Sequence, residues 1–248
     1  MELADVLRDP PKPHIQSGRR VSMGLVPAAV AFIHEIVDDS CATLETGCGL
    51  STVAFALTGA RHIVIAPLPD ELEYLKRYCD ERHIATDRVR FIAGGSQSVL
   101  PSLQPPPLDL VLIDGCHGFP SPCIDWFFTA GFLKRGGHLV VDDTWVWSCQ
   151  ILRDFLCAQP QWQLITEFEY RTAVFRKLEN GAEWLEWTEQ PLVARAGRRK
   201  WIGGRMHYRQ PFGATRVGRA ANDLRHGDVK GLMGKIARVV SRLARATR

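Results

Sequence analysis

The sequence of 248 residues contains no long apolar segment and no pattern typical of a secreted, disulfide-bonded protein. No run of about eighteen uncharged apolar residues occurs, which argues against a membrane-spanning helix. The first residues, MELADVLRDPPKPHIQ, lack the charged and then apolar pattern of a secretory signal, so we expect a cytoplasmic protein. The seven cysteines form no CxxC pair, which disfavours a zinc site and favours reduced thiols.

The small net charge of +4 conceals two regions of opposite sign. Residues 191–248 contain twelve arginines and three lysines but only two aspartates, so this region carries a net charge of +13 and the first 190 residues carry −9. The asymmetry predicts an acidic body and a basic extension with different partners. We expect an N-terminal arm (1–20), a body (21–179), an extension rich in Gly, Arg and Trp (180–229) and a basic amphipathic helix (230–248).

Within the body, short apolar strands alternate with helices. The alternating part has strands predicted at residues 42–46, 61–66, 88–93, 108–113 and 138–141. Continuous apolar strands joined by helices are typical of a mostly parallel sheet with helices on both faces. Residues 162–168 and 171–178 differ, because they are consecutive strands with a very short connection. The pattern therefore predicts a doubly wound α/β fold in three αβα layers.

The segment TLETGCGLSTVAFA (43–56) contains a glycine turn between a predicted strand and a predicted helix. Gly47 and Gly49 let the backbone turn tightly and approach a ligand, and the helix start offers free N–H groups to an anion. Ser51 and Thr52 suit a helix cap or a contact with a carboxylate. A dinucleotide fingerprint needs a third glycine where Thr52 stands, so NAD binding is disfavoured. A turn that serves only the fold is the alternative.

These motifs together resemble class I S-adenosylmethionine-dependent methyltransferases, in the branch of the catechol and macrolide-sugar O-methyltransferases. ETGCG (45–49) resembles the family's first motif, and IAGGSQSVLPSL (92–103) resembles its adenine-contacting segment. The closing strands resemble the end of its seven-stranded sheet, in which the last strand inserts antiparallel. The resemblance covers about residues 20–178 and implies S-adenosylmethionine as cofactor. The cofactor-binding residues that it implies are Glu45, Gly47, Cys48, Gly49, Ser51, Thr52, Gly95, Ser96, Gln97 and Asp114.

One position departs from the family's pattern. The second strand usually ends in an acid that accepts hydrogen bonds from the ribose hydroxyls, and Ala66 stands there in this chain. Asp70 and Glu71 begin the next helix, where both suit the positive helix end without any ligand, although either could reach back. The sequence favours the structural interpretation of these two acids. A non-catalytic binding protein on the same fold therefore stays open as an alternative.

Aspartates end two of the predicted strands: Asp114 follows LDLVLI, and Asp142 and Asp143 follow GGHLVV. We expect these strand ends to lie near each other, so that the three carboxylates converge at one edge. Crowded carboxylates raise one another's pKa unless a cation compensates, and Mg²⁺ prefers oxygen ligands. The arrangement also resembles the metal site of the catechol-type and macrolide-sugar enzymes. We therefore predict a magnesium site at these three aspartates, with helix capping as the alternative.

His117 follows three residues after Asp114, and we predict both as catalytic residues. In the catechol enzymes the position corresponding to His117 carries a lysine that acts as the base. A histidine suits proton removal from a metal-bound hydroxyl, whereas a surface histidine bonded to backbone is the alternative. The predicted function is magnesium-assisted O-methylation of a small molecule, sugar or lipid-linked glycan. RNA methylation is the second hypothesis, although no NPPY-type tetrad or catalytic cysteine pair is recognisable.

The final segment, KGLMGKIARVVSRLARATR, places apolar side chains on one helical face and cations on the opposite face. Such a helix can pack on the body, lie on an anionic membrane surface at the inner membrane face, or bind nucleic acid. The lack of interleaved aromatics in an RNA-binding module disfavours nucleic acid. A homodimer also stays open as a partner.

Overall fold

The computed structural model describes residues 1–181 and 185–198. The chain divides into two units, of which the first comprises Met1–Ala194. The basic helix predicted at 230–248 and most of the predicted extension lie outside the described residues. Among the described residues, no helix is long and apolar enough to cross a membrane.

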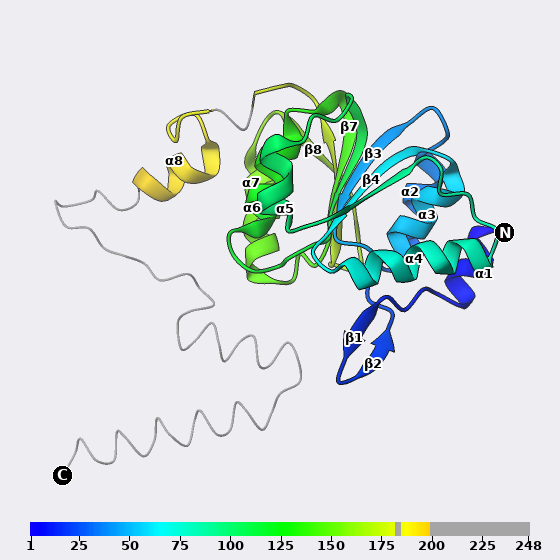
Figure 1. Cartoon of the computed structure of the whole chain (residues 1–248). Coiled ribbons are helices and arrows are strands. Elements are labelled where there is room, and N and C mark those ends of the chain that lie inside the picture. The colour runs from blue at the N-terminus through cyan, green and yellow to red at the C-terminus, as the bar shows by residue number, and fades with distance from the viewer. Residues whose placement is uncertain (182–184, 199–248) are drawn as a thin grey trace, which may run out of the picture. The chain divides into compact units, whose positions relative to one another are not determined.

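Seven strands form one sheet in the order β5-β4-β3-β6-β7-β9-β8 (Figure 1). They are β3 (Ala42–Thr46), β4 (Arg61–Ala66), β5 (Val89–Ala93), β6 (Leu108–Ile113), β7 (Leu133–Val141), β8 (Trp162–Phe168) and β9 (Thr172–Lys177). Strands β3 to β7 pair in parallel, and β9 lies antiparallel between β7 and β8. The predicted fold class, including the antiparallel last strand, is confirmed.

Helices cover both faces of this sheet (Figure 1). One face carries α1 (Leu3–Arg8), α2 (Pro27–Ile36), α3 (Leu50–Thr58) and α4 (Pro69–Glu81). The other carries α5 (Ser96–Val99), the 3-10 turn η1 (Leu100–Ser102), α6 (Ser121–Ala130) and α7 (Trp147–Ala158). A further helix, α8 (Pro191–Arg198), follows the sheet in the chain. Alternate residues of each strand enter opposite cores: Leu110 and Leu112 of β6 pack on the first face, Val111 and Ile113 on the second.

The segment predicted as an N-terminal arm packs against this body. Val6 of α1 is completely buried, and strands β1 (His14–Gln16) and β2 (Arg19–Val21) form a hairpin. The hairpin region is fastened to α4 by two tyrosines. The Tyr74 hydroxyl accepts a hydrogen bond from the Lys12 N–H at 3.2 Å, and the Tyr78 hydroxyl donates to the Asp9 carbonyl at 2.7 Å.

Candidate active site

A cavity of about 550 Å³ lies at the carboxyl ends of the parallel strands. The loops after β3, β4, β5, β6 and β7 contribute most of its wall. His14 and Met23 of the N-terminal segment and Arg171 of the β8–β9 turn complete it. Ligands of doubly wound sheets bind at this edge, so the cavity is the candidate active site.

The loop after β3 depends on Gly47. Its φ of +91° is unfavourable for other residues, and a Cβ there would overlap the carbonyl oxygen of Asp114. The Gly47 N–H donates to the Ile65 carbonyl at 2.9 Å, which ties the loop to β4. Gly47 and Cys48 both line the cavity, where an extended ligand can lie against them. A glycine without a side chain at position 47 is compatible with the close approach of a cofactor such as S-adenosylmethionine.

Four of the predicted cofactor contacts, Glu45, Gly49, Ser51 and Thr52, do not line the cavity. Glu45 is completely buried beneath the loop and accepts hydrogen bonds from Thr52 Oγ1 and, at 2.6 Å, from Ser51 Oγ. The Gly49 N–H donates to Thr52 Oγ1 at 3.0 Å. These side chains join β3 to the start of α3 and so shape the loop from below. The structure shows these four residues supporting the loop, and their direct contact with the cofactor stays a prediction.

The residues after β5 do face the cavity. Gly95, Ser96 and Gln97 all line it, at the end opposite to β7 in the sheet order. Asp125 of α6 lies beneath them, completely buried. Burial raises the pKa of Asp125, and the neighbouring Ser96 and Thr46 act in the opposite direction. The predicted adenine contacts are thus placed on the cavity wall, although their role stays a prediction.

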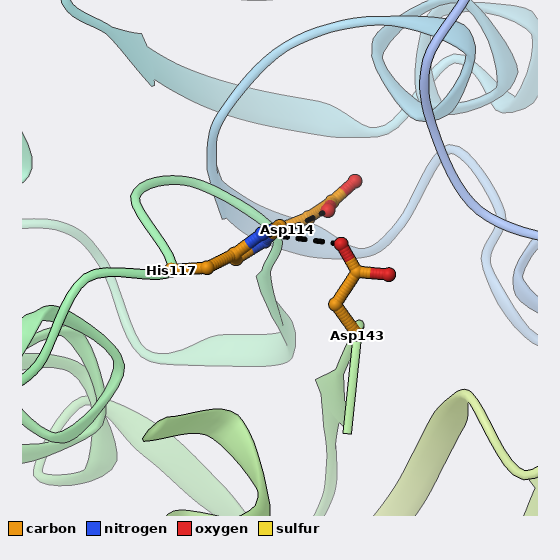
Figure 2. A group of neighbouring side chains, drawn as sticks. All are labelled: Asp114, His117 and Asp143. Atoms are coloured by element: carbon orange, nitrogen blue, oxygen red, sulfur yellow. Dashed lines mark ion pairs between the residues drawn. The ribbon is translucent and has the colours of Figure 1, made fainter. Parts of the chain in front are cut away.

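Asp114, His117 and Asp143 lie together on the β6–β7 side of the cavity (Figure 2). His117 Nδ1 is 3.1 Å from Asp143 Oδ2, and His117 Nε2 is 3.7 Å from Asp114 Oδ1. The His117 carbonyl accepts a hydrogen bond from the Ser148 hydroxyl, which anchors this loop to α7. Asp143 has a φ of +51°, a conformation that aspartate tolerates better than most residues. The structure thus brings together the two predicted catalytic residues and one of the two adjacent aspartates.

Asp142 is separated from this group. Its side chain is completely buried and accepts hydrogen bonds from the Thr172 hydroxyl and, at 3.3 Å, from Arg171 Nη2. Asp142 and Thr172 lie one residue beyond the β7–β9 pair Val141–Ala173, and side chains directly opposite in a sheet share a face. The predicted set of three metal-binding aspartates is therefore corrected: His117 stands beside Asp114 and Asp143 where Asp142 was expected.

Arg171 is a charged site residue that the sequence did not predict. A tight turn at Glu169 and Tyr170, both with φ near +50°, returns the chain so that Arg171 reaches the end of β7. Its Nε lies 2.8 Å from Asp143 Oδ1, and its Nη2 contacts Asp142. An arginine at the start of a last strand is no sequence signal by itself, because its partners depend on the turn. In the structure it supplies the positive charge between two carboxylates.

The charges of this group are strongly coupled. Burial raises the pKa of Asp114 to about 7, with the nearby Asp142 adding to the shift and His117 opposing it. The neighbouring Asp114 raises the pKa of His117 against the effect of burial, and the charge of Asp143 raises it further. Burial therefore favours the protonated form of Asp114, and the neighbouring carboxylates favour the protonated form of His117.

The donor set does not fit the predicted magnesium site. Both Asp142 oxygens have protein donors, and Asp143 Oδ1 accepts from Trp145 Nε1 at 2.9 Å in addition to its contact with Arg171. The remaining possible ligand set includes the His117 imidazole, whereas Mg²⁺ prefers oxygen ligands in octahedral geometry. Arg171 already provides a compensating cation, so we derive no step through a metal.

Comparison with known proteins supports the resemblance found in the sequence. Residues 44–144 match the family model described as a methyltransferase domain. No curated protein matches the chain. A solved structure of cofactor-bound Rv0187 from MTB has 20% sequence identity and a TM-score of 0.55, covering 64% of this chain and 83% of that one.

Two further similar structures are O-methyltransferases. The O-methyltransferase from Bacillus cereus in complex with SAH has 16% identity and a TM-score of 0.52, covering 63% of this chain and 83% of that one. TomG from Streptomyces achromogenes, involved in tomaymycin synthesis and solved with SAM, has 15% identity and a TM-score of 0.53, covering 63% and 82%. At these identities the likeness shows the fold. Together with the family match it confirms the resemblance to class I S-adenosylmethionine-dependent methyltransferases.

Proposed function

We propose that this protein transfers a methyl group from S-adenosylmethionine to a hydroxyl oxygen. The observation that carries the proposal is His117, whose Nδ1 is held by Asp143 and whose buried Nε2 has no hydrogen-bond partner among the described residues. Nε2 belongs to a cavity-lining side chain next to the glycine loop. A base and a candidate cofactor site therefore share one cavity.

For the cofactor, we propose that Gly95, Ser96 and Gln97 hold the adenine and that the glycine loop and Asp114 hold the methionine portion. These residues, including Gly47 of the glycine loop, all line the cavity. When bound, S-adenosylmethionine supplies an electrophilic methyl group on its sulfonium. The protein contributes by holding an acceptor oxygen in line with this group, which can supply about 7–11 kcal/mol in well-aligned systems.

His117 is the proposed general base. Its contact with Asp143 favours the tautomer that carries hydrogen on Nδ1, so that Nε2 can accept the hydroxyl proton. Arg171 holds Asp143 in place through its 2.8 Å contact. Proton removal thus depends on an imidazole and its carboxylate, without a metal-bound hydroxyl.

The acceptor proposed here is a small hydroxylated ring compound, either aromatic or a sugar, free or lipid-linked. Large aromatic side chains stand exposed on the His117 side: Phe119, Trp145 and Trp147 are exposed by 63%, 63% and 51%. The rings of Phe119 and Trp147 lie 5.7 Å apart, and Phe119 lies in the loop between the cavity residues His117 and Ser121. Exposed rings at a cavity edge offer flat apolar faces to a ring-shaped ligand.

The test is transfer of a labelled methyl group from S-adenosylmethionine to a panel of phenols, catechols, sugars and lipid-linked sugars, with total RNA in parallel. We expect transfer to an oxygen of a small acceptor, unaffected by EDTA and reduced at least about 100-fold in His117→Ala. Methylation of RNA alone would support the second hypothesis. No binding of the cofactor at all would support the non-catalytic alternative and contradict the proposal.

A further inference from the structure

Glu71 points toward the cavity instead of capping its own helix. It lies in the first turn of α4, whose N-cap residue Leu68 makes no side-chain cap hydrogen bond. Residues 71, 75 and 78 share one side of a helix, and Leu75 and Tyr78 are buried, so the same side carries Glu71 toward the sheet. Its side chain is 13% exposed and lines the cavity. The neighbouring Asp70 is exposed and does not line it.

Three separate elements meet at the Glu71 carboxylate. His14 Nδ1 of strand β1 lies 2.9 Å from Oε1, and the Cys48 thiol of the glycine loop lies 3.8 Å from Oε2. The hairpin that carries His14 is held on α4, where the Arg20 guanidinium stacks 4.6 Å from the centre of the Tyr74 ring. The carboxylate is therefore fixed in the wall by the N-terminal hairpin, and Oε2 retains capacity because a thiol is a weak donor.

The position of Glu71 matches the part of the cavity that lacks an acid at its strand end. Ala66 ends β4 and lines the cavity with only a methyl group, which leaves space between the strand end and α4. The other two carboxylates of the wall, Asp114 and Asp143, follow β6 and β7 and contact His117. Among the described residues, Glu71 is thus the carboxylate on the β4 side of the wall.

We propose that Glu71 accepts hydrogen bonds from the ribose hydroxyls of the cofactor nucleoside and that His14 is its positioning residue. The inference rests on the proposed function. In the sheet order β5-β4-β3-β6-β7, the candidate adenine contacts follow β5, Glu71 follows β4, and the glycine loop follows β3. A nucleoside laid along this edge presents its vicinal diol, which donates two hydrogen bonds, between adenine and the glycine loop. A carboxylate that can accept further hydrogen bonds, as Glu71 Oε2 can beside a weak thiol donor, suits such a diol.

The test is calorimetric titration of the full chain with S-adenosylhomocysteine and with an analogue that lacks both ribose hydroxyls. For wild type, we expect the analogue to bind about 10- to 100-fold more weakly than S-adenosylhomocysteine, as for loss of hydrogen bonds to a charged group. Glu71→Gln and Glu71→Ala are expected to bind S-adenosylhomocysteine more weakly than wild type by a similar factor. Their affinity for the analogue should stay within about threefold of that of wild type. Asp70→Asn, the exposed neighbour, is the matched control and is expected to bind both as wild type does.

His14→Ala is expected to weaken the binding of S-adenosylhomocysteine by about 3- to 10-fold and to leave the binding of the analogue unchanged. Added to Glu71→Ala, it should cause no further loss of affinity. Equal binding of S-adenosylhomocysteine by wild type and Glu71→Ala would overturn this inference alone. Equal losses for both ligands in Glu71→Gln would also overturn it, because the effect would then be structural. Failure of wild type to bind S-adenosylhomocysteine would overturn the proposed function, and this inference with it.

Discussion

Replacement of Arg171 by methionine tests the role of this side chain as the internal cation of the site. The Asp142 side chain is completely buried and accepts hydrogen bonds from Arg171 and Thr172. Removing one partner of a buried ion pair costs about 3–5 kcal/mol, because the remaining charge is left buried. The Arg171 side chain is 34% exposed, so water screens part of the interaction. We therefore expect Arg171→Met to lower the free energy of unfolding by about 2–3 kcal/mol.

The assay is urea denaturation followed by circular dichroism, in a cycle with Asp142→Asn and the double variant. The double variant should be more stable than the sum of the single losses predicts, by about 1–2 kcal/mol, because the neutral amide no longer needs the guanidinium. Arg176→Met, an exposed arginine of β9, is the control and should change stability by less than about 0.5 kcal/mol. A loss for Arg171→Met no larger than for Arg176→Met, or strict additivity with Asp142→Asn, would refute the reasoning.

Three further predictions follow from the same site. Gly47→Ala combines a positive φ with overlap on the Asp114 carbonyl and should lower the free energy of unfolding by at least about 2 kcal/mol in urea denaturation. Asp143→Asn removes a charge that raises the pKa of His117, so the rising limb of the pH profile of kcat/KM should move to lower pH. The same variant should lower kcat about tenfold or more. A rising limb at the same pH as in wild type would contradict the assignment of His117 as the base. Asp114 has its pKa raised from 3.8 to about 7 in the folded state, so its contribution to stability is present below pH 3.8 and is lost as the pH rises through about 7. Asp114→Asn should therefore reduce the fall in unfolding free energy between about pH 5 and about pH 8 by up to about 2.5 kcal/mol. The same pH dependence of the unfolding free energy in wild type and Asp114→Asn would contradict this prediction.

Most of the sheet was predictable, because burial on both faces leaves apolar runs that few other structures produce. Strands β3, β4, β6 and β8 have the predicted bounds. Strand β7 begins five residues earlier than its predicted start at His138. Gly136 and Gly137 suggest a turn, but in the structure the chain continues along β6 there, with a shift of register between Leu108 and Leu110. The hairpin at His14 was not predicted, because its short strands are half exposed and carry no periodic pattern.

Site residues were predictable only where they directly follow a strand whose neighbours in the sheet were themselves predictable. Asp114 and His117 follow β6 in sequence, and their proximity needs no long-range information. The separation of Asp142 from Asp143 depends on the register of β9, and Arg171 arrives through a turn whose geometry the sequence does not announce. Glu71 was assigned to its helix terminus because its partner, His14, is 57 residues away in the chain.

The measurement that tests the central claim most directly is a crystal structure of the protein with S-adenosylhomocysteine bound. We predict the ligand in the cavity at the carboxyl ends of the strands, with adenine against Ser96 and Gln97, the ribose hydroxyls on Glu71 and the sulfur facing His117. A ligand bound elsewhere, or a cavity that stays empty at saturating S-adenosylhomocysteine, would contradict the account.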